Sequence, residues 1–101
     1  MIDYSYADHA WQQAANLLAI DSPSGFTVKA VTWLKEQFEI LGFSAVITTK
    51  GGLLIDLGGE NPEDALMLAA HTDTLGGMVA EIKGSGRLRL TNLGGMKADN
   101  G

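Results

Sequence analysis

The residues best suited to chemistry lie in one short polar segment that follows an apolar run. His71 and Asp73 stand two positions apart, directly after the run Ala65–Ala70. Imidazole is the commonest metal ligand in proteins, and a carboxylate close by can bind the same metal or orient the ring. The pattern therefore indicates a candidate metal site with His71 as a ligand. It also fits a simple capped loop after a strand, and that alternative stays open.

The number of available ligands limits what this segment can do alone. A catalytic zinc site needs three protein ligands and an open position. His9 is the only other histidine, and it falls in a predicted helix, where a solvated role is expected. The chain has no cysteine, which excludes thiolate metal sites and disulfide staples. His71 and Asp73 therefore predict part of a metal site and not a complete one.

The second polar segment of interest is Ser22-Pro23-Ser24-Gly25. A serine in such a turn could be a nucleophile, but no base or oxyanion motif accompanies it. Pro23 disfavours helical dihedrals at Ser22, and Gly25 permits a tight turn. The pattern favours a segment that ends one helix and caps the next. The two tryptophans fall at helix positions and are expected to be core or interface anchors.

The elements that must position these residues follow from the periodicity of apolar residues. Apolar steps of three and four predict helices over residues 6–20 and 26–41, the second ending at Gly42. Strands are expected at residues 43–49, 53–57, 65–70, 78–83 and 87–91. The continuous apolar run 65–70 predicts a strand that is buried on both faces, at the centre of an α/β sheet.

Sites in open α/β sheets form at the carboxyl ends of central strands. His71 and Asp73 directly follow the predicted central strand, so we expect them at such an end. The pair Gly76-Gly77 is expected to turn the backbone away sharply and to leave room for a ligand. This arrangement would present the His-x-Asp segment at the edge of the sheet.

Composition excludes several classes of function. The chain has 101 residues, with 7 Lys and Arg against 12 Asp and Glu, a net charge of −5. This balance argues against nucleic-acid partners, which require a basic face. Hydrophobic residues make up 46%, as in globular proteins, but no apolar run approaches the ~20 residues of a membrane helix. No secretory signal is visible, so no membrane partner and a cytoplasmic location are expected.

Three stretches carry a resemblance to a known family. They are the helix end and serine turn at 17–25, the glycine pair and strand at 51–56, and the His-x-Asp segment with its flanks at 67–79. A fourth, 86–95, resembles the start of an inserted small β-domain. Together they make the chain similar to the N-terminal part of the M42 metallo-aminopeptidases, the glutamyl-aminopeptidase and tetrahedral-aminopeptidase group.

The resemblance implies a fold and a division of the chain. Residues 1–92 would form the N-terminal part of an α/β, phosphorylase/hydrolase-like mixed-sheet catalytic domain. Residues 93–101 would start the inserted β-domain. The glycine-rich end, from Leu93 onward, has no pattern of a terminal helix or strand, which fits a loose tail and a chain cut within a loop equally. The resemblance favours the second, because it places this end inside the inserted domain, before most of the metal ligands, so we expect the chain to be a fragment of a longer protein.

The resemblance also implies an activity and a role for each site residue. It implies two divalent metal ions, zinc or cobalt, and removal of N-terminal amino acids from peptides, usually by a homo-oligomer. His71 would be a metal ligand, and Asp73 the catalytic-centre acid that steadies it. Thr72 and Thr74 stand where the family usually has Met and Glu, which leaves both functional residues in place. The other ligands and the general base are absent from these 101 residues, so the chain alone is expected to be inactive.

Two other functions remain open. One is a different co-catalytic zinc hydrolase, such as an amino-acid deacylase or a carboxypeptidase, although the early Gly94-Gly95 pair favours the aminopeptidase group. The other is a complete small α+β binding module without catalysis. Against the module stands the run 66–70, which requires cover on both faces. Exposed sheet edges invite association, so the isolated chain is expected to be sticky or oligomeric.

Overall fold

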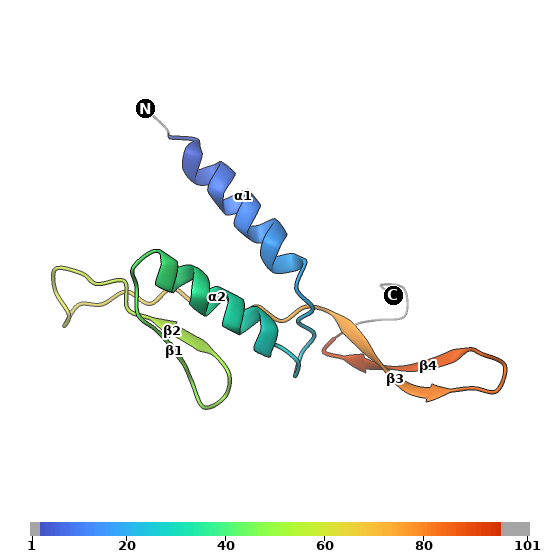
Figure 1. Cartoon of the computed structure of the whole chain (residues 1–101). Coiled ribbons are helices and arrows are strands. Elements are labelled where there is room, and N and C mark those ends of the chain that lie inside the picture. Colours follow the sequence, from blue (N-terminus) through green and yellow to red (C-terminus); the bar gives the residue numbers. More distant parts are fainter. Residues whose placement is uncertain (1–2, 96–101) are drawn as a thin grey trace.

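The computed structural model describes residues 3–95, which form two helices and two β-hairpins (Figure 1). The helices are α1, Ser5–Leu18, and α2, Val28–Ile40. The strands are β1, Ala45–Ile47; β2, Leu53–Ile55; β3, Gly76–Ile82; and β4, Leu88–Leu93. These bounds confirm the two predicted helices and four of the five predicted strands, each within a few residues.

The best-packed part of the molecule is α2 against the β1–β2 hairpin. Ala30 and Val31 of α2 and Ala45 of β1 are buried, and they form the small apolar core. The helix ends where the sequence predicts, because Gly42 adopts φ 95° and donates its N–H to the carbonyl of Glu39 at 3.0 Å. The core is small because only α2 and the β1–β2 hairpin contribute residues to it.

The strands form two separate antiparallel pairs, β1 with β2 and β3 with β4. The first pair turns at Gly51 (φ 87°) and the second at Gly86 (φ 86°), as the glycine pattern predicts. The second pair contains a register shift between Val79 and Glu81. It projects from the end of the molecule opposite the β1–β2 hairpin (Figure 1).

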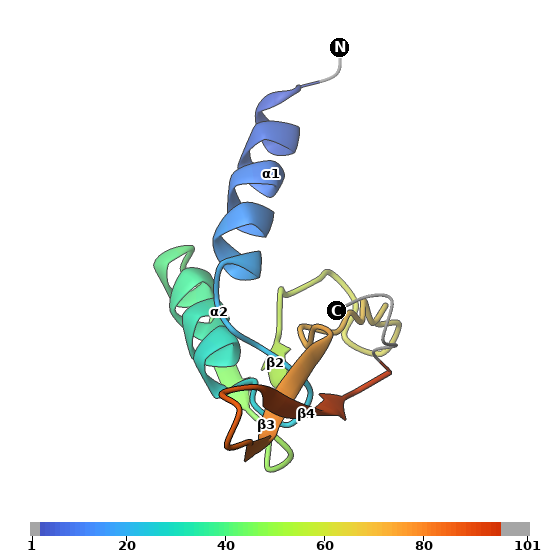
Figure 2. The same ribbon diagram turned by 90° about the vertical axis from the view of Figure 1, so that its right-hand side faces the viewer.

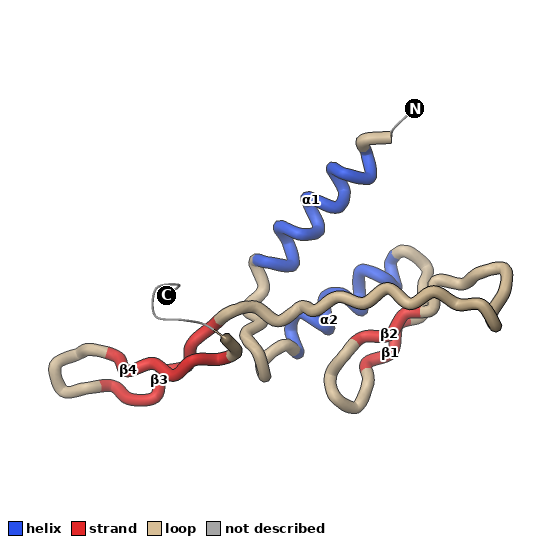
Figure 3. The backbone as a smooth tube through the Cα atoms, turned by 180° about the vertical axis from the view of Figure 1, so that it is seen from behind, coloured by secondary structure: helices blue, strands red, loops and turns tan. Residues whose placement is uncertain are grey.

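The predicted central strand at 65–70 is wrong for the described structure. These residues lie in the long connection between β2 and β3, which is drawn as loop in Figure 3. Leu66, Met67 and Leu68 are almost fully exposed, at 87%, 79% and 82%. A strand needs hydrogen-bonding neighbours, and the four described strands pair with one another instead. The apolar run is therefore uncovered.

The predicted glycine break at Gly76-Gly77 is also wrong, because both residues begin β3 and pair with Leu93 and Asn92.

Trp11 is exposed on α1 and does not enter the core, whereas Trp33 of α2 is half-buried. The predicted start of an inserted domain at 93–101 overlaps the end of β4. Its residues 96–101 lie outside the described part of the chain.

The molecule is far from spherical, and α1 extends away from the remainder (Figures 1 and 2). Its radius of gyration is 18.0 Å, against about 13 Å for a compact domain of this length. Its accessible surface is 8678 Å², against about 5,500 Å² for a compact monomer of this mass.

The mixture of helices and strands is consistent with an α/β class, but the described strands do not form one mixed sheet. No helix of the described residues is long and apolar enough to cross a membrane.

Candidate functional site: the His-x-Asp loop

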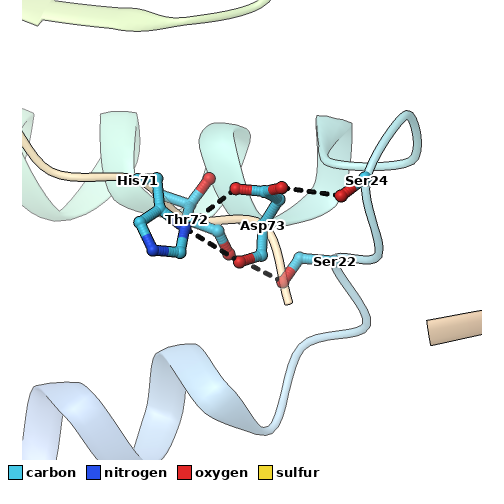
Figure 4. Close-up of polar contacts among 5 residues, drawn as sticks. All are labelled: Ser22, Ser24, His71, Thr72 and Asp73. Atoms are coloured by element: carbon cyan, nitrogen blue, oxygen red, sulfur yellow. Dashed lines mark hydrogen bonds and ion pairs between the residues drawn. The ribbon is translucent and has the colours of Figure 1, made fainter. Parts of the chain in front are cut away.

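His71 and Asp73 contact each other in the loop that precedes β3 (Figure 4). The Nδ1 atom of His71 lies 2.9 Å from Oδ1 of Asp73 and 3.1 Å from the Asp73 carbonyl oxygen. Residues two apart in an extended chain place their side chains on the same side, which explains how so short a spacing permits the contact. The two predicted site residues are thus brought together, in a loop and not at the end of a strand.

The contact determines which ring nitrogen of His71 carries a proton. Both neighbours of Nδ1 are acceptors when the carboxyl is ionised, so Nδ1 must be the donor. In the neutral ring the lone pair then lies on Nε2. The His71 side chain is 85% exposed, so this lone pair is available to a ligand. This geometry is the one in which a carboxylate orients a metal-binding histidine.

The second oxygen of Asp73 is held by a segment about fifty residues earlier in the sequence. Ser24 donates its hydroxyl to Oδ2 of Asp73 at 2.7 Å, as the dashed lines in Figure 4 show. This hydrogen bond, and after it the hydrogen bond from His71, lowers the pKa of Asp73 below its usual value. The carboxylate is therefore kept ionised, with each of its oxygens bonded to a different residue.

A short parallel bridge attaches the serine segment to the His-x-Asp loop. Pro23 pairs with Thr74, and the Thr74 N–H donates to the Ser22 carbonyl at 2.8 Å. The Ser22 side chain is 2% exposed, and its hydroxyl donates to the Thr72 carbonyl at 3.0 Å. Burial of this hydroxyl is compensated by its hydrogen bond. The bridge and both serines thus fix the backbone on either side of Asp73.

Two glycines allow the serine segment to approach this closely. A Cβ at Gly76 would lie 2.6 Å from Cβ of Pro23, and a Cβ at Gly94 would lie 2.9 Å from Oγ of Ser24. Gly76 therefore serves close packing of the backbone against Pro23, not the sharp turn that its sequence predicts. Gly94, at the predicted start of an inserted domain, packs against Ser24 in the segment that holds Asp73.

Comparison with known proteins identifies the family. The model of the M42 glutamyl aminopeptidase family matches residues 51–100. YhfE of Bacillus subtilis (strain 168), assigned as an aminopeptidase, is 38% identical over 81 residues, which cover 80% of this chain and 23% of YhfE. Glutamyl aminopeptidase of Lactococcus lactis subsp. cremoris (strain MG1363) is 35% identical over 81 residues, 78% of this chain and 22% of that enzyme.

The chain belongs to the M42 family. The match to the family model includes the whole His-x-Asp segment and the strands β3 and β4. The alignments span less than a quarter of the length of either curated relative. The resemblance that the sequence carries at residues 51–56 and 67–79 is thereby confirmed.

Within this M42 chain, the donor set fits one ligand of a divalent metal site. The exposed Nε2 of His71 is suitable, whereas the oxygens of Asp73 are already bonded to His71 and Ser24. The described residues contain no group of three or more His, Cys, Asp or Glu side chains that could hold a metal ion. His9 lies on α1, far along the chain from the site. His71 is therefore compatible with a metal but cannot complete its coordination.

Ser22 and Ser24 belong to the site, although their sequence predicts only a segment that ends one helix and caps the next. The segment does separate α1 from α2, but the predicted cap is wrong, because the N-cap residue of α2 is Thr27. The contact with Asp73 spans 49 positions, and no local pattern records such a distance. The available signal was the presence of two serines beside Pro23 in a stretch that also carries the family resemblance.

Proposed function

We propose that this M42 chain supplies a metal ligand, His71, and the acid that orients it, Asp73, to a metal-dependent aminopeptidase. The enzyme would remove N-terminal amino acids from peptides. Family membership supports the peptidase class, as do the names of the two relatives. The observation that carries the site assignment is the hydrogen bond between Nδ1 of His71 and Asp73, which leaves Nε2 to accept a metal.

Asp73 and His71 each have a defined role in this proposal. Asp73 retains the proton on Nδ1 of His71 and fixes the plane of the ring. His71 offers its exposed Nε2 toward solvent, where a peptide can approach. When bound, a pair of divalent cations, zinc or cobalt, would lower the pKa of a water molecule and polarise the scissile carbonyl. The remaining ligands and the general base are assigned to sequence that the described residues do not contain.

Three further features belong to the proposal. The 101-residue chain alone is expected to be inactive, because the described residues provide a single histidine at the site. A homo-oligomer is the expected assembly of the complete enzyme. An amino-acid deacylase or carboxypeptidase remains the alternative, but the matches to M42 and to two named aminopeptidases favour the aminopeptidase. The elongated shape argues against a self-contained binding module.

The test is a chimera with the Lactococcus lactis relative. The segment of that glutamyl aminopeptidase that aligns with this chain is replaced by this chain's sequence. We expect release of N-terminal glutamate from a chromogenic peptide analogue and loss of activity after treatment with a chelator. His71→Ala should lower kcat by at least about 100-fold, since even the loss of a ligand's hydrogen-bonding partner costs 10–100-fold.

The matched control is His9→Ala, which removes the other histidine from the exposed surface of α1 and should leave kcat unchanged. A soluble, folded chimera whose activity does not depend on His71 would contradict the ligand assignment. Equal activity in the presence of excess chelator would contradict metal dependence. Cleavage at the carboxyl end of peptides would instead support the carboxypeptidase alternative.

A further inference from the structure

The serine segment 22–24 is the one part of the site that the proposed function does not use. It lies between α1 and α2, yet its hydroxyl groups reach the loop that carries His71 (Figure 4). Capping of α2 does not explain it, because that helix begins at Val28 and its N-cap residue is Thr27. The two serine hydroxyls are directed toward residues 72 and 73 instead.

We propose that Ser24 is a positioning residue, whose hydroxyl fixes the Asp73 carboxylate so that Asp73 holds Nδ1–H of His71 and leaves Nε2 for a divalent cation. The part of this statement that concerns the cation rests on the proposed function. The part that concerns the orientation of Asp73 and the tautomer of His71 does not, because it follows from hydrogen bonds in the chain itself.

Burial alone does not fix the orientation of the Asp73 carboxylate. Its side chain is 43% exposed, so water competes for both oxygens and the carboxylate could rotate. Ser24 bonds Oδ2 at 2.7 Å while His71 bonds Oδ1 at 2.9 Å. Rotation of the carboxylate would break both hydrogen bonds together. The Ser24 hydroxyl therefore restricts the carboxylate to the orientation in which Oδ1 faces the imidazole.

Ser24 can do this because its own backbone is fixed. The Pro23–Thr74 bridge joins the two segments, and the buried Ser22 hydroxyl bonds the Thr72 carbonyl. A turn follows, in which the Phe26 N–H donates to the Pro23 carbonyl at 2.8 Å. A site is precise when the residues that support it are themselves held. The segment 22–24 meets this condition through contacts independent of the Ser24 hydroxyl.

The experiment measures the tautomer of His71 by ¹⁵N NMR of the imidazole nitrogens in the metal-free 101-residue chain, with Leu66 and Leu68 replaced by Asn to suppress association through the exposed loop. The pH is set where the ring is neutral. We expect His71 to carry its proton on Nδ1, whereas the exposed His9 provides an internal reference. Ser24→Ala should shift His71 toward the tautomer mixture of His9, and Ser24→Thr, which keeps a hydroxyl, should retain the proton on Nδ1.

Zinc affinity is then measured in the chimera with the Lactococcus lactis relative, because His71 alone cannot complete a metal site in this chain. Ser24→Ala should weaken zinc binding by about 10-fold, at the lower end of the range for partners of metal ligands. Ser85→Ala, in the exposed β3–β4 turn, is the control for removal of a serine hydroxyl and should change neither measurement. Exchange protection of the Thr74 amide reports whether the Pro23–Thr74 bridge survives each substitution.

Three outcomes overturn the positioning role. In the first, His71 of the wild-type chain carries its proton on Nε2. In the second, Ser24→Ala keeps the protection of the Thr74 amide and leaves the His71 tautomer unchanged. In the third, Ser24→Thr keeps this protection but shows the same His71 tautomer as Ser24→Ala. The first needs no variant, so a substitution that disrupts the loop cannot leave the proposal undecided. A chimera that binds no zinc, together with a Ser24-dependent tautomer, would refute the metal assignment and leave the positioning of Asp73 standing. Zinc binding by the chimera that is insensitive to Ser24, together with a Ser24-dependent tautomer, would refute only the effect of Ser24 on the cation.

Discussion

At the scale of residues, Asp73 connects two segments that the sequence separates widely. One oxygen of its carboxylate accepts a hydrogen bond from His71 and the other accepts a hydrogen bond from Ser24. An ionised carboxylate accepts both hydrogen bonds, whereas a protonated one must give up an acceptor site. The arrangement of the site therefore depends on the charge of Asp73.

This dependence gives a prediction for acid pH. Because the folded pKa of Asp73 is lowered, first by Ser24 and then by His71, the contact contributes its full stability above the ordinary carboxyl pKa, about 3.9. The contribution is lost as pH falls through the lowered value. Ser24→Ala should raise the pKa of Asp73 toward normal, as measured by a ¹³C NMR titration of its carboxyl carbon.

Ser85→Ala provides the comparison, since its hydroxyl lies in a distant turn. An Asp73 titration curve that coincides in wild type and Ser24→Ala would show that the serine does not stabilise the carboxylate. The difference in stability between wild type and Ser24→Ala should vanish at pH values at which Asp73 is protonated in both proteins.

At the scale of elements, the site depends on how closely β3 approaches the segment between the helices. Gly76 begins β3, and the place of its missing Cβ is 2.6 Å from Pro23. The left-handed region is not involved, because Gly76 has no positive φ. Its requirement for glycine is therefore steric, and a larger residue must displace the Pro23–Thr74 bridge.

Gly76→Ala should open this bridge. Overpacking costs about 1–3 kcal/mol, so the protection of the Thr74 amide against hydrogen exchange should fall by roughly 10-fold or more. Gly59→Ala is the matched control, because a Cβ there meets nothing within 4 Å and Gly59 has no positive φ. Unchanged Thr74 protection in Gly76→Ala would show that the proline yields without cost.

At the scale of the whole molecule, the chain exposes more surface than a domain of its size should. The excess over a compact monomer is about 3,000 Å², which is at least as large as the roughly 1,000–2,500 Å² that each partner buries in an obligate interface. Much of the uncovered apolar surface lies on the loop 66–68 and on both hairpins. Unpaired apolar segments of this kind associate readily.

We therefore expect the 101-residue chain to self-associate at micromolar concentration, in sedimentation velocity experiments. Replacing Leu66 and Leu68 by Asn should reduce the associated fraction several-fold, because the two side chains are 87% and 82% exposed. Replacing Thr49 and Lys50 by Asn, in the exposed polar β1–β2 turn, should have no such effect. A wild-type chain that sediments as a monomer at all concentrations would contradict this expectation.

The sequence by itself determined the local elements and the paired site residues. Apolar steps of three and four define α1 and α2, glycines mark the turns at Gly51 and Gly86, and the spacing of His71 and Asp73 permits their contact. These features depend on residues within a few positions of one another, so the local sequence pattern is sufficient to predict them. The resemblance to M42 also came from local stretches of sequence.

The tertiary structure alone decided what lies against the site. The apolar run 65–70 has the composition of a buried strand, but a strand forms only where partners are present, and the described strands pair elsewhere. The role of Ser24 depends on a contact across 49 positions, and that of Gly76 on its approach to Pro23. Such contacts arise when separate segments pack together, and no short-range periodicity encodes them.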